Sequence, residues 1–195
     1  MFRRVVISVV IVLAVIIAVG GWLWLGRDQP RPGVFRAEPT SAFYAPIDSR
    51  QVDSAPLTLQ EVFTPAVQTV GSMRLEDKQQ FTDCDEVLWG ASAEGCTQAL
   101  RATYQGGAMV GQFVIFNLSD GRAADALVAA LGKDGFVRQE VPFEATGSRA
   151  QARAMGHYVT VSWVGGPAPA QELIDGLVKL DGLGRVVQSR IVAVT

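Results

Sequence analysis

The chain has 195 residues, of which 49% are apolar, 18% are charged and 8% are aromatic. Seventeen basic residues against nineteen acidic ones leave a formal net charge of −2, which excludes a basic nucleic-acid-binding domain and a disordered acidic tail. The length is sufficient for one hydrophobic core and hardly for two.

The chain begins with an uncharged apolar run. Val5–Leu25 contains twenty-one residues without a charge, and as a helix it would be about 31 Å long, close to the thickness of bilayer hydrocarbon. Trp22 and Trp24 stand at its far end, where amphipathic rings favour the headgroup layer. A cleaved signal peptide is the alternative, but this run exceeds the usual apolar region of about 7–15 residues and no cleavage motif follows it. We therefore expect residues 1–25 to be a retained transmembrane anchor.

The charges that flank this run are nearly balanced, since two arginines precede it and three follow closely. We place the N-terminus inside the cell because only four residues precede the apolar run and because the two cysteines beyond it favour an oxidising compartment. This orientation predicts a single-pass protein of the cell membrane with an extracytoplasmic C-terminal domain. The chain beyond Leu25 has a net charge of −4 and offers no polybasic strip for anionic lipids.

A proline-rich segment follows the predicted anchor. Residues 26–56 contain five of the nine prolines and no apolar periodicity, which is typical of an extended, semi-stiff linker. Residues 57–195 then have the size of one ordinary domain, without internal repeats.

The predicted secondary structure of this domain starts with a weak strand pattern at Val67–Met73 and a capping box at Asp83–Glu86, which begins a short helix. Thr97–Tyr104 alternates between two faces, and Met109–Leu118 is rich in β-forming residues. The turn residues Gln105–Ala108 join the two segments into a hairpin. Because the second strand has apolar side chains on both sides, we expect it to be central and covered on both faces.

The second half of the domain contains a predicted helix at Gly121–Leu131, followed by strands at Phe136–Glu144 and Gln151–Val164 around the polar loop Ala145–Ala150. Prolines mark the start of a last helix, after which Arg185–Val194 fits either a helix or a closing strand. This order predicts an α+β fold of the ferredoxin-like kind, in which helices cover one face of a mainly antiparallel sheet.

Cys84 and Cys96 are the only cysteines. They follow the predicted anchor and bracket the predicted short helix, so an oxidising compartment favours a disulfide between them over two free thiols. Such a bridge closes a thirteen-residue loop and is worth about 3 kcal/mol in the chain-entropy description. The spacing is too wide for a Cys-x-x-Cys redox motif, and one distant histidine does not complete a zinc site. We therefore expect a structural disulfide and neither a metal nor a cofactor site.

A catalytic constellation is weakly supported. His157 is the only histidine, and the Gly90-Ala-Ser-Ala-Glu-Gly segment around Ser92 lacks the glycine that a nucleophile elbow requires two residues after the serine. A hydrolase would need these two side chains together with an acid such as Asp85 or Glu94. We expect no catalytic residues and no enzymatic activity.

Two further patterns in the sequence resemble binding sites. Asp83–Glu94 has the length of a calcium loop, but Leu88 stands where the turn requires glycine. Arg101 and Arg153 lie on predicted strands and could hold a carboxylate or phosphate if both faced outward. Paired surface arginines are common, so neither pattern is sufficient to predict a site.

The pattern Asp83-Cys84 followed by Gly95–Tyr104 resembles an uncharacterised family of small anchored or secreted extracytoplasmic domains from high-GC Gram-positive bacteria. The alanine-rich helix after Phe116 and the segment Gly156–Trp163 fit the same family. The resemblance covers about residues 57–195. It implies an extracytoplasmic location and assigns no catalytic residues.

These observations predict a non-enzymatic, membrane-anchored extracytoplasmic module that senses, scaffolds or binds an envelope component. Loops Gln105–Ala108 and Ala145–Ala150 are its expected contact surfaces, because loops on a rigid platform commonly carry binding residues. One alternative is a small subunit of a membrane protein complex, in which the anchor itself makes the contact. The other is the envelope hydrolase that would use Ser92 and His157. The sequence determines neither the ligand or partner nor the oligomeric state.

Overall fold

The computed structural model describes residues 30–194, and the predicted anchor at 1–25 lies outside them. Within 30–194, no helix combines the length and the apolar character needed to cross a membrane.

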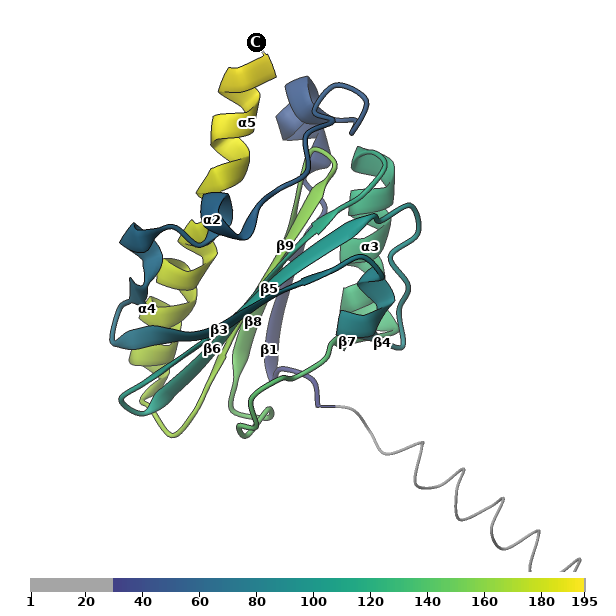
Figure 1. Ribbon diagram of the computed structural model, residues 1–195. Helices are drawn as coiled ribbons and strands as arrows, with labels where there is room; N and C mark the ends of the chain where they lie inside the picture. Colours follow the sequence, from purple (N-terminus) through teal and green to yellow (C-terminus); the bar gives the residue numbers. More distant parts are fainter. Residues whose placement is uncertain (1–29, 195) are drawn as a thin grey trace, which may run out of the picture.

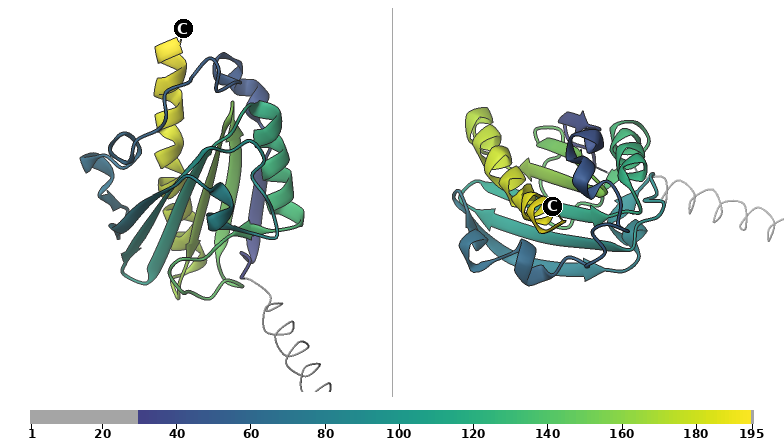
Figure 2. Two further views of the ribbon diagram at one scale, coloured as in Figure 1. Left: turned by 45° about the vertical axis from the view of Figure 1, so that its right-hand side comes forward. Right: turned by 90° about the horizontal axis from the view of Figure 1, so that it is seen from above.

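A curled, seven-stranded mixed sheet forms the centre of the domain (Figures 1 and 2). The strand order is β1-β8-β9-β6-β5-β3-β2; β1 runs parallel to β8, and the other neighbouring pairs are antiparallel. The small strands β4 and β7 pair separately. The strands are β1 (Val34–Glu38), β2 (Thr69–Val70), β3 (Met73–Phe81), β4 (Leu88–Trp89), β5 (Gln98–Gly106), β6 (Met109–Asn117), β7 (Phe136–Val137), β8 (Arg149–Met155) and β9 (Tyr158–Gly165).

Helices cover both faces of the sheet. One face packs against α3 through Val114 and Phe116 of β6, whereas Phe113 and Ile115 of the same strand belong to the core beneath α4. β6 is therefore central and buried on both sides, which confirms the prediction for this strand. The helices are α2 (Leu59–Val62), α3 (Gly121–Lys133), α4 (Ala170–Asp181) and α5 (Val186–Val194), and the 3-10 turns are η1 (Ser41–Ile47), η2 (Pro65–Val67), η3 (Cys84–Val87) and η4 (Gly182–Arg185).

The prediction of a ferredoxin-like fold with helices on one face is wrong. The sheet is mixed and curled, and α3 and α4 lie on opposite faces of it. The physical reason is burial, because β5, β6 and β9 are covered along almost their whole length and each face needs its own layer of apolar side chains. The segment that the sequence left open between helix and strand is helical, as α5.

Part of the predicted linker belongs to the domain. Val34–Glu38 forms β1 and pairs in parallel with the first residues of β8, and Ile47 in the following turn is fully buried. The predicted boundary at residue 57 is therefore corrected to lie before β1. The sequence did not predict this strand, because it lies in a proline-rich segment and has no apolar pattern of its own. Hydrogen bonds to β8 stabilise it instead.

Residues 53–61 are fixed by a buried ionic cluster around Arg190 of α5. Its guanidinium binds Asp53 Oδ1 at 3.0 Å and both carboxylate oxygens of Glu61 at 2.8 and 2.7 Å. The Tyr158 hydroxyl donates to Asp53 Oδ2 at 2.7 Å. The cluster joins the former linker, the start of β9 and the C-terminal helix, so these distant segments form one unit.

Candidate functional site

The predicted disulfide is present between Cys84 and Cys96, whose Cα atoms lie 6.2 Å apart. Cys84 begins η3 and is buried in the core beneath α3, and Cys96 lies two residues before the start of β5. The bridge therefore connects the η3 turn to the segment that leads into a buried strand, which is a structural role.

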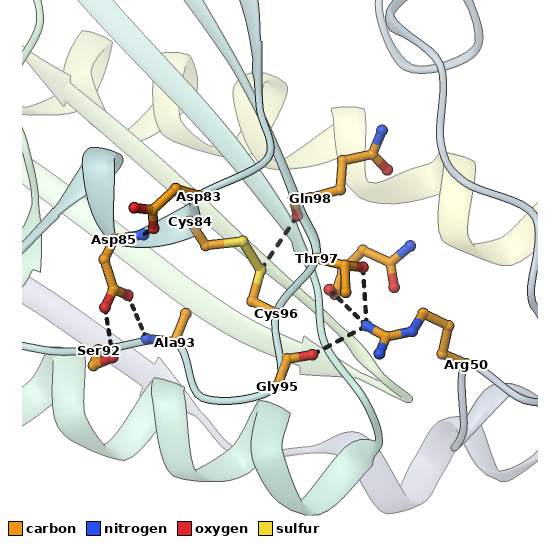
Figure 3. The surroundings of a disulfide bond; sticks show 11 residues. Arg50, Asp83, Cys84, Asp85, Ser92, Ala93, Gly95, Cys96, Thr97 and Gln98 are labelled. Atoms are coloured by element: carbon orange, nitrogen blue, oxygen red, sulfur yellow. Dashed lines mark hydrogen bonds between the residues drawn. A yellow bond between two sulfur atoms is a disulfide. The ribbon is translucent and has the colours of Figure 1, made fainter.

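Hydrogen bonds fix the same loop at two further points (Figure 3). The Asp85 carboxylate accepts from the Ser92 hydroxyl at 2.6 Å and from the Ala93 amide at 2.8 Å. Arg50, in the segment that was predicted as a linker, donates to the Gly95 carbonyl oxygen and to Thr97 Oγ1, both at 3.0 Å. The disulfide loop is therefore a rigid platform on this side of the sheet.

Ser92 and His157, the two side chains that a hydrolase would need, have separate partners. Ser92 is exposed and donates to Asp85, whereas His157 is fully buried with Nδ1 2.7 Å from the Ile47 carbonyl oxygen. Burial lowers the pKa of His157, and its ring lies against that of Tyr158 with centroids 4.0 Å apart. The structure thus places His157 as a packed residue and does not bring it to Ser92.

Asp83, the first carboxylate of the calcium-loop pattern, has a capping role. Asp83 accepts from the Asp85 amide at 3.0 Å as the N-cap of η3, in agreement with the predicted capping role. In the part of the chain that the structure describes, no cluster of three or more histidine, cysteine or acidic side chains could hold a metal ion.

The two strand arginines lie on opposite faces of the sheet and are already paired. Arg101, on the α3 face, contacts Glu140 at 2.7 Å. Arg153, on the α4 face, contacts Glu38 at 2.8 Å and Asp181 at 3.1 Å. They therefore cannot hold one anion between them.

The expected contact loop Gln105–Ala108 lines a partly open pocket of about 520 Å³ at one end of the sheet, whereas the expected loop Ala145–Ala150 contributes only Gly147 to it. We call this cavity the loop-end pocket. Its walls come from the β5–β6 turn, the loop that leads into β8 and the residues that follow β9. The lining residues lie within Gln105–Val110, Pro142–Gly147 and Gly166–Pro167.

Fixed aromatic and glycine contacts shape the pocket. The Phe143 ring packs edge-on against the buried Trp163, with ring centroids 5.0 Å apart. Gly165, at the end of β9, lies so close to Phe143 that a side chain at this position would collide with its ring. Trp163 Nε1 in turn donates to Ser148 Oγ at 2.7 Å, which holds the loop to the sheet. The pocket is therefore formed by the fold itself.

The loops around the pocket carry almost no charge. We call the segments Gln105–Val110, Val141–Gly147 and Gly165–Ala170 the tip loops; among their nineteen residues, Glu144 is the only charged one. Its carboxylate accepts from Thr146 Oγ1 at 2.6 Å and from the Thr146 amide at 3.2 Å. These hydrogen bonds lower the pKa of Glu144, so the rim carries one stable negative charge beside apolar walls.

A second cavity, of about 570 Å³, lies on the other side of Phe143 and Glu144. Pro30, Arg31 and Trp89 complete its lining together with the loop before β8. The start of the described chain therefore lies one side chain away from the loop-end pocket. The sequence patterns did not predict this contact, because they placed Phe143 in a strand and residues 26–56 in a linker.

Comparison with protein-family models, with curated proteins and with solved structures found no match. The resemblance to anchored or secreted domains of high-GC Gram-positive bacteria stays a prediction.

Proposed function

We propose that this protein is a membrane-anchored extracytoplasmic binding module that uses the loop-end pocket as its binding site. The observation that carries the proposal is the convergence of two loops, distant in sequence, around an apolar pocket with a single rim carboxylate. A few polar groups on apolar walls are the usual composition of small-molecule sites. The ligand would then be mainly apolar.

The disulfide supports the extracytoplasmic part of the proposal. Bridges of this kind persist in oxidising compartments and are rare in the reducing cytosol. The apolar run Val5–Leu25, whose flanking arginines we assign to a cytoplasmic head, supports the anchor.

Fractionation of cells that produce the full chain with a C-terminal tag tests this placement. We expect the protein to resist carbonate extraction and its tagged domain to be degraded by protease added outside spheroplasts. We also expect its two cysteines to react with a thiol reagent only after reduction. A matched variant with Val12→Arg and Ile16→Arg should lose the membrane association, because charges at the centre of a helix oppose insertion. A freely soluble full-length chain, or a protected domain, would contradict the proposal.

A further inference from the structure

The domain joins the N-terminal segment at the end that carries the loop-end pocket. Arg31 is fixed there, since its guanidinium donates to the Leu131 carbonyl oxygen at 2.9 Å and lies 5.8 Å from the Trp89 ring centroid. The Gly33 amide donates to the Ala145 carbonyl oxygen at 3.0 Å, which binds the chain to the loop before β8. The position of this junction relative to the pocket is therefore set by direct contacts.

The segment between the apolar run and the domain is short. Five residue steps separate Leu25 from Pro30, and a chain of this length spans at most about 18 Å. The polar layer on each side of the bilayer hydrocarbon is about 5–8 Å thick. If Val5–Leu25 spans the bilayer, as our proposed function holds, the pocket end of the domain lies within reach of the lipid headgroups.

The two ends of the domain differ in their content of charged residues. The tip loops expose Ala108, Pro142 and Pro167 and carry one charge among nineteen residues. The loop Asp48–Asp53, at the opposite end of β9, carries three charges among six residues. Low charge lowers the cost of placing these loops against lipid, because a charged side chain loses hydration in an apolar environment.

We propose that the loop-end pocket binds the acyl chain of a bilayer lipid while the tip loops lie in the interfacial layer. This inference rests on the proposed anchor and names the ligand class of the same site. Met109, Val110 and Phe143 supply apolar wall to the acyl chain. The Glu144 carboxylate stays at the mouth, in the polar layer, because Thr146 already satisfies it from the rim.

Photocrosslinking tests the inference on the full chain in phosphatidylcholine vesicles that contain a phospholipid with a diazirine on its acyl chain. After irradiation and digestion, we expect labelled peptides from the anchor and also from Gln105–Val110 and Pro142–Gly147. A labelled anchor with unlabelled tip loops overturns the inference and leaves the proposed anchor standing. An unlabelled anchor in protein that carbonate extracts from the vesicles overturns the proposed function as well.

Two glycines provide a matched pair of variants. A Cβ atom at Gly147, on the pocket lining, or at Gly182, remote from it, would meet no non-neighbouring heavy atom within 4 Å, so both positions have room for a side chain. Gly147→Leu places a bulky side chain at the mouth of the pocket and should reduce labelling of the tip loops at least fivefold, whereas Gly182→Leu should leave it unchanged. Labelling of the Gly147→Leu protein equal to that of the unaltered chain would overturn the inference.

A second pair of substitutions, at exposed residues, keeps the inference testable if Gly147→Leu disturbs folding. Ala108→Asp puts a charge on an exposed tip position, and Val192→Asp puts one on α5, whose Val192 side chain is 77% exposed. We expect several-fold weaker tip labelling only for the first variant, because a charge opposes contact with acyl chains. Equal labelling in both variants would count against the pocket.

Discussion

Arg190→Ala removes the centre of the buried ionic cluster that joins α5 to residues 53–61. The change deletes the hydrogen bonds to Asp53 and Glu61 and also those to the Ala55 and Pro56 carbonyl oxygens. Glu61 is 34% exposed and can be solvated by water after the change, but Asp53 is 5% exposed and keeps only Tyr158 as a partner. The loss is therefore mainly the cost of an unpaired buried carboxylate.

Breaking a buried ion pair by removing one partner costs about 3–5 kcal/mol. Because Tyr158 still donates to Asp53 and Glu61 becomes solvated, we expect the lower end, about 3 kcal/mol of unfolding free energy. Urea titration of the full chain in detergent micelles, followed by tryptophan fluorescence, measures this loss. Arg185→Ala is the matched control, since Arg185 is exposed, and it should stay within about 0.5 kcal/mol of the unaltered chain.

A double-mutant cycle separates the pair from its surroundings. Arg190→Met combined with Asp53→Asn should cost less than the sum of the single changes, by about 1–3 kcal/mol, because the second change removes the charge that the first leaves unpaired. A loss below about 1 kcal/mol for Arg190→Ala, or additive single changes, would refute the assignment of this cluster as a stabilising connection.

Three further predictions concern stability. Replacing Cys84 and Cys96 by serine should lower the unfolding free energy by about 3 kcal/mol, and dithiothreitol should produce the same shift in the unaltered chain but none in the variant. Burial holds the pKa of His157 in the folded chain below its usual 6.5, so at a pH between the folded and unfolded pKa values the unfolded chain binds more protons. The unfolding free energy should therefore fall as the pH drops below 6.5, and it should fall less in His157→Asn. Urea midpoints at several pH values measure this difference. Phe136→Ala should cost about 3–5 kcal/mol because this ring is fully buried, whereas Phe43→Ala, at an 84% exposed ring, should change the thermal midpoint little.

Local sequence signals were sufficient for several elements. The β5–β6 hairpin was predicted because its alternation and its turn residues are both contained in one short segment. The start of α3 was predicted because Asp120 caps it directly, accepting from the Ala123 amide at 2.9 Å. The pairing of Cys84 with Cys96 was predicted from an expected oxidising compartment and from the absence of any other cysteine.

Only the tertiary structure decided how these elements assemble. β1 was hidden in a proline-rich segment because a strand at a sheet edge needs a partner's hydrogen bonds more than an apolar pattern. The predicted strand over Phe136–Glu144 shortens to β7, because its partner β4 has only two residues. The sides of the sheet taken by α3 and α4, and the meeting of the tip loops around one pocket, depend on contacts between residues far apart in the chain. Propensity and periodicity describe neighbours along the chain, whereas these arrangements are fixed by burial and pairing across it.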